Sequence, residues 1–319
     1  MIPLATEQIT HMIKIDLPKL KSLSEKHNII SSIINGKSCQ YLDIPRYPNI
    51  GDHLIAHGCF HFFESSGIQL SRASDIFSYQ QKWLSETDVI VFSGGGNFGT
   101  LWPDIHKRRL LLAREALELG KTVIILSQSI YYENTLQIKE DKEILGSFPN
   151  FYFFARDTYS YNISQGMFEH IYLAPDMAHQ LYNLFNKYAP LHPQDDSRLY
   201  FMRKDKEASN DRFTKITNDG TIVDWDDLLK INNCAKPFNT YNALYKKLRC
   251  FQFDKNLTYW RRTSWKIIET AVNFFLKYDS VITDRLHGMI LSLLLNRKVH
   301  MIDNNNHKLS NYAKTWLLN

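Results

Sequence analysis

Short apolar stretches alternate with helix-like segments through much of the chain, and polar residues follow directly after the apolar stretches. In order, the pattern predicts a strand over 88–92, a helix over 103–119, a strand over 122–126, a helix over 134–146, and strands over 151–154 and 171–173. This alternation is typical of a parallel, doubly wound α/β sheet. Because such sheets bind ligands outside the carboxyl ends of their strands, we expect functional residues among the polar residues that end these strands.

The strongest candidate for such a site is the stretch 278–288, late in the chain. Val281 and Ile282 indicate the end of a short buried strand, and the Leu-rich run Met289–Leu295 indicates a helix. The residues between them include Asp284, Arg285, His287 and Gly288. A helix N-terminus and a guanidinium group both favour an anion, and an imidazole can donate to a phosphate or carry a proton. The combination indicates an anion site rather than an ordinary loop.

The first 35 residues carry helix-like spacing of apolar residues, from Ile9, Met12 and Ile13 onward, and Pro18 predicts a break between two helices. A strand is expected from about Cys39 to Ile44, followed by a turn-rich loop over 46–52. Asn49 and Asp52 belong to this loop, and Asp52 is expected to cap a helix over 53–63.

That helix places His53, His57 and His61 on one face, because they are four residues apart. Three imidazoles in a row suggest a metal, but Leu54 stands where H-E-x-x-H requires glutamate, and no carboxylate is placed to complete the set. We therefore predict no metal site. A polar face toward a cleft is favoured, in which His53 and His57 contact substrate.

The stretch 93–99 is rich in glycine, and Gly94, Gly96 and Gly99 match G-x-G-x-x-G. The next helix is expected to begin at Pro103 rather than at the third glycine, and no acidic residue follows the next strand to bind a ribose. The match therefore does not predict a dinucleotide. We expect Gly95, Gly96 and Asn97 to lie where backbone approaches a ligand or a neighbouring loop.

The length of 319 residues suits two domains, and two prolines with several polar residues over 187–197 suggest the boundary. We predict an N-terminal Rossmann-like domain over 1–186 and a C-terminal one over 187–319. The second is expected to contain strands over 199–202 and 299–302, a helix over 265–277, and a terminal helix with Tyr312 and Trp316.

The net charge of +5 suits an anionic small molecule or membrane surface but is too diffuse to predict nucleic-acid binding. The N-terminus does not resemble a signal peptide, and no apolar run approaches the length of a membrane-spanning helix. These features predict a cytoplasmic protein.

Taken together, the motifs resemble those of the polysaccharide pyruvyl transferases. The matching pieces are 49–52, 93–99, Ala155-Arg156-Asp157, Ala174-Pro175-Asp176, Arg203-Lys204-Asp205, 284–288, and Asp303 with Lys308, Tyr312 and Trp316. The resemblance implies two Rossmann-like domains facing a cleft, as in GT-B glycosyltransferases. It also implies transfer of pyruvate from phosphoenolpyruvate onto two hydroxyls of a sugar, without a further cofactor. The few residues after Trp316 leave little room for a long C-terminal helix that returns to the first domain.

By position, the resemblance places Arg203, Arg285, Leu286 and His287 on phosphoenolpyruvate. The residues suit this chemistry independently, because a donor with a phosphate and a carboxylate requires two cationic groups in one cleft. The methylene carbon must gain a proton and a sugar hydroxyl must lose one, so the reaction needs an acid and a base. His287 is the first choice for proton transfer, Asp284 either orients His287 or neutralises Arg285, and the base comes from Asp52, His53 or His57. Lys308 is a further substrate-binding candidate.

Two alternatives remain open from the sequence. The same cleft suits a GT-B-like glycosyltransferase that uses a nucleotide sugar, and a non-catalytic saccharide-binding protein would need the same surface. The acceptor is expected to be a saccharide of a surface-polysaccharide precursor, either lipid-linked or attached to a nucleotide.

The segment 241–266 combines seven basic residues with seven aromatic ones and only one acidic residue. The favoured interpretation is a helix with a solvated basic face and aromatic residues packed inward. The alternative is peripheral contact with the inner face of a membrane, since basic residues are attracted to anionic lipid and Trp and Tyr prefer the interfacial layer.

Overall fold

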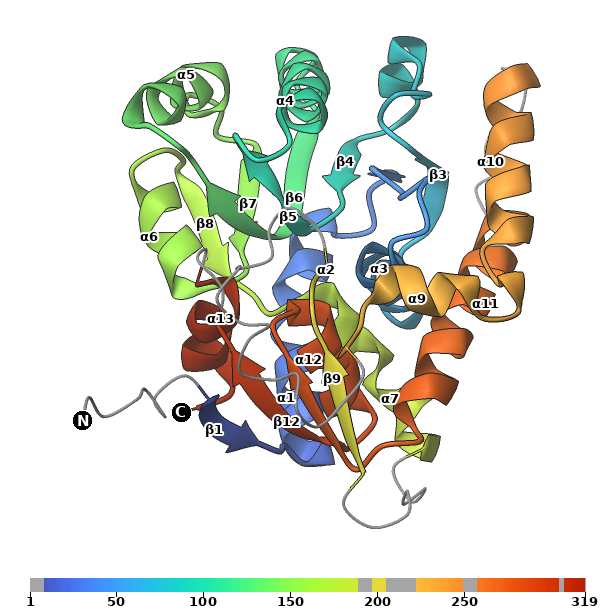
Figure 1. The fold of residues 1–319 in the computed structure, drawn as a ribbon. Helices are drawn as coiled ribbons and strands as arrows, with labels where there is room; N and C mark the ends of the chain where they lie inside the picture. The colour runs from blue at the N-terminus through green and yellow to red at the C-terminus, as the bar shows by residue number, and fades with distance from the viewer. Residues whose placement is uncertain (1–8, 189–196, 205–221, 249–256, 304–306, 319) are drawn as a thin grey trace.

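Two β-sheets, each covered by helices, make up the fold (Figure 1). The computed structural model describes residues 9–188, 197–204, 222–248, 257–303 and 307–318. The larger sheet occupies the upper half of Figure 1, and the smaller sheet occupies the lower half. The prediction of an α/β, GT-B-like fold with parallel sheets is confirmed.

The larger sheet is built from the first half of the chain and has the order β3-β2-β4-β6-β7-β8, with β5 pairing with β6. Every strand pair in it is parallel. Its direction of growth reverses between β2 and β4, a topological switch point at which such sheets bind ligands. Its strands are β2 Cys39–Leu42, β3 Leu70–Ser74, β4 Val89–Phe92, β5 Gly95–Gly99, β6 Thr122–Tyr131, β7 Phe151–Ala155 and β8 His170–Leu173.

The smaller sheet has the order β1-β12-β11-β9-β10, and only β1 runs antiparallel to its neighbour. Its growth reverses between β9 and β11, which gives this sheet a switch point of its own. Its strands are β1 Ile9–Ile13, β9 Arg198–Phe201, β10 Ile222–Val223, β11 Ser280–Thr283 and β12 Lys298–Ile302.

Helices connect the strands and cover the sheets (Figure 1). The α-helices are α1 Leu17–Glu25, α2 Asn28–Ile34, α3 Ile50–Ser65, α4 Pro103–Glu118, α5 Thr135–Leu145, α6 Thr158–Gln165, α7 Tyr182–Phe185, α9 Trp225–Lys230, α10 Lys236–Leu248, α11 Thr258–Phe275, α12 Leu286–Leu294 and α13 Lys308–Trp316. Short 3₁₀ helices are η1 Gln81–Glu86, η2 Met177–Leu181, η3 Asn186–Tyr188 and η5 Ile231–Asn233.

The start of the chain differs from the sequence-based expectation. Ile9–Ile13 was expected to be helical but forms β1, which pairs with β12 at the edge of the smaller sheet. Pro18 does not break a helix but lies in the first turn of α1, where a missing N–H is tolerated, and Asp16 caps that helix. Pairing with β12 supplies β1 with the backbone hydrogen bonds that helical spacing alone could not predict.

Two further elements begin or end elsewhere than expected. The cap of α3 is Asn49 rather than Asp52, because the Asn49 side chain accepts a hydrogen bond from the Asp52 backbone N at 3.2 Å. Strand β6 does not end at Leu126 but continues to Tyr131, because the glycine-rich stretch forms β5 alongside it. Gly94 permits this pairing, since a Cβ there would lie 2.6 Å from the carbonyl oxygen of Ser127.

One continuous buried cluster joins the two halves of the chain. It contains Tyr41 and Phe63 from the larger sheet and its helix α3, and Val281 and Trp260 from the smaller sheet and its helix α11. Trp260 also donates from its indole nitrogen to the carbonyl oxygen of Pro45 at 2.9 Å. The division into domains at residue 187 stays a prediction, and the proline-rich segment that suggested it lies mostly outside the described residues.

Candidate active site

A cavity of about 410 Å³ lies between the carboxyl ends of the two sheets. It draws residues from both switch points, so neither sheet forms it alone. Its lining residues are Tyr47, Asn49, Asp52, Gly96, Asn97, Trp102, Ile105 and Arg156 from the first half, and Arg203, Trp225, Arg285, Leu286, His287 and Lys308 from the second. The sequence-predicted residues Asn49, Asp52, Gly96, Asn97, Arg203, Arg285, Leu286, His287 and Lys308 therefore come together.

The first turn of α3 brings Asp52 to this cavity. The Asn49 cap fixes the helix start, and the Tyr47 hydroxyl is hydrogen-bonded to the Asp52 carboxyl group. Burial raises the pKa of Asp52, and the nearby His287 and the bond from Tyr47 oppose that rise. A carboxyl group with a raised pKa is a better proton acceptor than an ordinary surface carboxylate.

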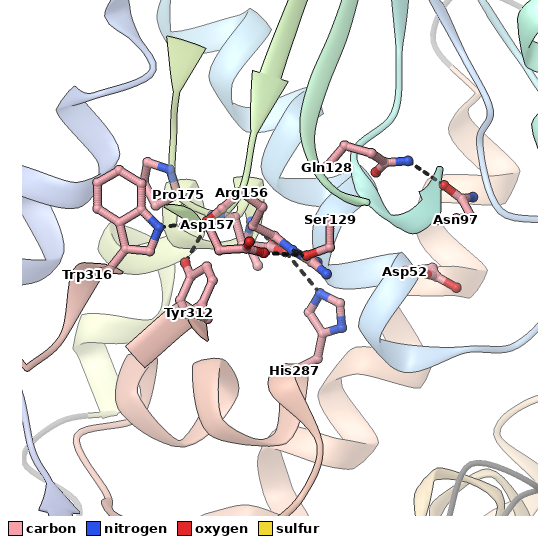
Figure 2. Close-up of polar contacts among 12 residues, drawn as sticks. Asp52, Asn97, Gln128, Ser129, Arg156, Asp157, Pro175, His287, Tyr312 and Trp316 are labelled. Atoms are coloured by element: carbon pink, nitrogen blue, oxygen red, sulfur yellow. Dashed lines mark hydrogen bonds and ion pairs between the residues drawn. The ribbon is translucent and has the colours of Figure 1, made fainter. Parts of the chain in front are cut away.

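The first turn of α12 brings His287 to the opposite side of the same cavity (Figure 2). Its ring packs against Gly51 of α3 so closely that a Cβ at Gly51 would lie 2.8 Å from the His287 Cγ. The ring nitrogen Nε2 is 3.2 Å from Oδ2 of Asp176. A carboxylate partner favours a proton on Nε2, and Nδ1 is the ring atom that lies nearest to Gly51 at the start of α3.

Asp176 and Arg156 form the buried support of His287. Arg156 follows β7 and donates to Oδ2 of Asp176 at 2.8 Å and to Oγ of Ser129 at 3.1 Å. Both side chains are almost fully buried. Burial alone would raise the pKa of Asp176, but His287 and Arg156 hold it well below its ordinary value. Asp176 therefore stays ionised. Ser129, Arg156, Asp176 and His287 form a polar chain of hydrogen bonds that holds the imidazole in place (Figure 2).

Arg285 has a carboxylate partner that was not predicted from the sequence. Its Nε and Nη2 atoms both donate to the carboxylate of Asp224, the cap of α9, and the Nη2 contact is 2.6 Å. The predicted partner Asp284 is buried and accepts a hydrogen bond from the Arg203 backbone N at 2.8 Å, which links the ends of β9 and β11. Arg203 and Arg285 thus reach the cavity from adjacent strands of the smaller sheet.

The glycine-rich stretch supplies a third side of the cavity. Gly95 has a φ of +126°, which a side chain would strain, and Gly96 lies where a Cβ would be 3.5 Å from Arg156 and 3.7 Å from Nζ of Lys308. Asn97 accepts a hydrogen bond from Nε2 of the fully buried Gln128 at 2.6 Å. The glycines therefore let the backbone approach side chains from both halves of the chain.

Helix α13 of the smaller sheet docks directly behind this polar chain (Figure 2). The Tyr312 hydroxyl accepts from the Asp176 backbone N at 3.0 Å, and the Trp316 indole donates to the Arg156 carbonyl oxygen at 2.8 Å. This short helix thus reaches the first half of the chain, and its first residue is Lys308. Its docking fixes the distance between the two sides of the cavity.

His53 and His57 do not line the cavity. His53 is fully buried against Phe238 and Trp260, and burial lowers its pKa to about 3. His57 stacks on Trp260, its Nε2 lies 2.7 Å from Oγ of Ser264, and burial lowers its pKa well below the ordinary value. Successive residues of a helix point about 100° apart, so Asp52 faces the cavity while His53 faces α10 and α11. Neither is placed to act as the acceptor base.

The histidine face instead borders a second surface cavity of about 450 Å³, lined by His57 and His61 together with residues of α11. Within the described residues, no group of three or more His, Cys, Asp or Glu side chains is arranged to hold a metal ion.

Five residues at or behind the cavity were not predicted from the sequence to be site residues: Arg156, Asp176, Asp224, Tyr47 and Gln128. Arg156 and Asp176 had a usable signal, because both follow predicted strands and belong to the motifs quoted above. Asp224 and Gln128 had no comparable signal, since each acts through a side chain that is distant in sequence.

Similarity to known proteins extends over most of the chain. A family model described as "Polysaccharide pyruvyl transferase" matches residues 49–306. The chain is 34% identical over 304 residues to a Bacillus subtilis (strain 168) protein named "Putative pyruvyl transferase EpsO", covering 93% of this chain and 91% of that protein. It is 26% identical over 300 residues to "Pyruvyl transferase 1" of Schizosaccharomyces pombe, covering 88% of this chain and 70% of that protein. A crystal structure of a functionally uncharacterized Klebsiella pneumoniae protein superposes with a TM-score of 0.57 at 22% identity, covering 90% of this chain and 91% of that one, and it supports the fold alone.

Proposed function

This chain belongs to the polysaccharide pyruvyl transferase family, and we propose that it moves pyruvate from phosphoenolpyruvate onto two hydroxyls of a saccharide. The observation that carries this proposal is the division of charge across the cavity. Arg203, Arg285 and Lys308 line the side formed by the smaller sheet, whereas the carboxyl group of Asp52 lies on the side formed by the larger sheet. A dianionic phosphate and a carboxylate suit the first side, and a hydroxyl that must lose a proton suits the second.

The donor is proposed to bind at the N-terminus of α12. The described residues provide no side-chain cap for this helix, so its backbone N–H groups, including that of Leu286, are directed toward the donor position. Arg203 and Arg285 add charge-assisted hydrogen bonds, and Asp224 holds the Arg285 guanidinium in a defined plane. His287 is proposed to contact the donor from the same helical turn.

The proposed reaction begins with protonation of the donor and ends with loss of phosphate and closure of the ketal ring. His287 delivers a proton to the methylene carbon, which becomes a methyl group and leaves an oxocarbenium-like centre at C2. Asp52 accepts the proton of the first attacking hydroxyl as its oxygen bonds to C2. The C2–O bond to phosphate then breaks, a second hydroxyl of the same sugar closes the cyclic ketal, and its proton leaves with the phosphate. Asp52 then releases its proton to solvent and His287 takes one up, which restores both groups for the next turnover. The raised pKa of Asp52 and the Asp176–His287 pair support these roles.

The test is release of inorganic phosphate from phosphoenolpyruvate by purified protein, with and without a saccharide acceptor. We expect acceptor-dependent release and a pyruvate ketal in the product by mass spectrometry. Turnover of a nucleotide sugar with no response to phosphoenolpyruvate would indicate a glycosyltransferase. Binding of saccharide without either reaction would indicate a binding protein.

The acceptor is proposed to be a saccharide of a surface-polysaccharide precursor, either lipid-linked or attached to a nucleotide, and the reaction is proposed to take place in the cytoplasm. Peripheral contact with the inner face of the membrane is the alternative to a structural role for the segment 241–266. None of the described helices is both long and apolar enough to span a membrane. In the segment 241–266, Trp260 is buried in the core and Arg261 pairs with Glu64 at 2.6 Å, which supports a structural role for part of it. Tyr259 and Arg262 are exposed, and Lys246, Lys247, Arg249 and Lys255 lie outside the described side chains. Co-sedimentation with anionic and neutral vesicles, comparing wild type with Arg262→Gln and Lys266→Gln combined, tests the membrane contact.

A further inference from the structure

Most of the aromatic residues that the structure describes are buried or half-buried, but two exposed ones lie at the cavity. Among the six tryptophans, Trp102 is the most exposed, with 42% of its surface accessible, and it lines the cavity from the start of α4. Tyr47 is 44% exposed and lines the same cavity. A large aromatic ring that lines a cleft and is partly accessible offers a flat surface on which a ligand can pack.

A hydrogen bond fixes the orientation of the Tyr47 ring. Its hydroxyl group is hydrogen-bonded to Asp52, which anchors one end of the ring beside the proposed base. The rest of the ring lines the cavity. A ligand lying on this ring would therefore have its edge next to the Asp52 carboxyl group.

Asn97 adds a polar group of defined direction on the same side of the cavity. Its Oδ1 accepts from Nε2 of Gln128, and Gln128 is fully buried, so this contact fixes which way the amide faces. The Nδ2 amino group is then the donor that Asn97 presents to a ligand. In Figure 2, Gln128, Asn97 and Asp52 come from the larger sheet and its helices and lie apart from the polar chain that supports His287.

The side of the cavity formed by the first half of the chain has fewer cationic groups than the side formed by the second half. Apart from Arg156 at its base, the residues contributed by the first half of the chain are aromatic, aliphatic or amide groups and one carboxyl group. Such a surface does not suit a multiply charged donor. It suits a neutral ligand with an apolar ring face and hydroxyls on its edge, which is the chemistry of a pyranose sugar.

We propose that Trp102 and Tyr47 form a stacking subsite for one pyranose ring of the acceptor, with Asn97 donating to a hydroxyl and Asp52 beside the hydroxyl that reacts. This subsite rests on the proposed function, because it names the acceptor side of the same cavity. Gln128 is a positioning residue in it, since it acts through Asn97. The subsite binds the sugar by stacking against its ring face, so binding does not require a charged group on the acceptor.

The test is saturation-transfer NMR with methyl β-D-glucopyranoside, methyl β-D-galactopyranoside and methyl α-D-mannopyranoside, without phosphoenolpyruvate. Sorbitol is the control ligand, because it carries similar hydroxyls but has no pyranose face. We expect wild type to saturate the ring C–H protons of at least one glycoside, and we expect no effect on sorbitol. Trp102→Ala should weaken the glycoside signal at least about tenfold.

Matched variants separate the subsite from loss of the fold. Phe77→Ala removes an aromatic side chain that is 62% exposed but does not line the cavity, and it should keep the wild-type signal. Tyr47→Phe keeps the ring and should retain binding, whereas Tyr47→Ala should lose it. Circular dichroism melting of each variant checks folding.

Two results would overturn the subsite: no glycoside signal with wild type, or an undiminished signal in both Trp102→Ala and Tyr47→Ala. The proposed function is judged separately. If glycoside binding depends on Trp102 but wild type releases no phosphate from phosphoenolpyruvate, the subsite stands and the donor assignment fails. If phosphate release proceeds and Trp102→Ala leaves the acceptor KM unchanged, the function stands and the subsite fails.

Discussion

The helices α3 and α12 begin at the switch points of their two sheets and meet across the cavity, but their first turns differ in chemistry. Helix α3 has its own side-chain cap, Asn49, and an acidic residue, Asp52, in its first turn. Helix α12 has Arg285 at its cap position, with no side-chain cap from the described residues, and His287 in its first turn. The same strand-to-helix geometry thus gives one side that holds a proton acceptor and another that leaves backbone donors for an anion.

Asp52→Asn removes the proton acceptor from the α3 side, and we expect the largest effect here. The kcat should fall roughly 10²–10⁴-fold, as for loss of a general base. The KM for phosphoenolpyruvate should change little, because the donor is assigned to the α12 side. Steady-state kinetics with both substrates checks this, and a large rise in donor KM with kcat retained would place the donor on α3 instead.

Asp52→Asn is expected to raise the stability of the protein although it lowers kcat. Because the pKa of Asp52 is raised in the folded protein, its ionised form is less favourable there than in the unfolded chain. The folded state therefore loses relative stability as pH rises through the raised pKa, and Asp52→Asn avoids that loss. We expect a higher Tm for the variant at neutral pH, with the gain shrinking as pH falls from the raised pKa toward the ordinary carboxyl pKa and disappearing below it.

Arg285→Ala and Arg203→Ala remove the cations of the α12 side. Each loses charge-assisted hydrogen bonds of roughly 1.5–3 kcal/mol, so the Kd for phosphoenolpyruvate should rise about 10–150-fold. Arg285→Lys should be poorly tolerated, because an ammonium group cannot replace both contacts to Asp224 and still present a planar face to the donor. Calorimetric titration with phosphoenolpyruvate measures the change.

Arg262→Ala serves as the matched control for these variants, because this exposed arginine of α11 borders the second cavity. It should bind phosphoenolpyruvate like wild type. Unchanged donor affinity in both Arg203→Ala and Arg285→Ala would contradict the assignment of the donor to the smaller sheet.

Gly51→Ala acts where the two helix starts meet. The new methyl group would contact the His287 ring, which Asp176 holds from the other end, so the imidazole must shift. We expect kcat to fall on the order of tenfold or more, because small misplacements of catalytic groups reduce rates strongly. Stability should not fall much, since alanine favours a helix over glycine by about 1 kcal/mol.

Gly166→Ala is the control for that substitution, because a Cβ there would meet only the Ile163 carbonyl oxygen at an ordinary 3.7 Å. Wild-type kinetics in Gly51→Ala would show that His287 does not need its present position.

The smallest effect is expected from metal chelation. Phosphate charge is already countered on the α12 side by Arg203, Arg285 and Lys308, so EDTA should leave the rate of phosphate release within about twofold. If EDTA abolishes activity and a divalent ion restores it, a metal ion acts between the first turns of α3 and α12.

Much of this organisation followed from local sequence. The strands β4, β7, β8, β11 and β12 and the helices α4 and α5 lie close to their predicted ranges, because each is a short, strongly apolar or periodic segment with clear turn residues at its ends. Helix α12 was also predicted, but it begins at Leu286 rather than at Met289, so His287 lies in its first turn and not in the loop before it. Arg203, Arg285 and His287 were predicted to lie together because each follows a strand of a parallel sheet, and parallel strands end at one edge.

Tertiary structure decided the rest. The spacing of His53 and His57 defined a helical face but not its partner, and contact with Trp260 turned that face into the core. Ile9–Ile13 became a strand because β12, almost 300 residues later, offered it an edge. Asp176 and Asp224 gained their roles from His287 and Arg285, which lie 111 and 61 residues away. Local sequence determines where a strand ends and a helix begins, because those signals lie within a few residues. Which side chains meet across the cavity depends on how the two sheets pack, and no local pattern contains that information.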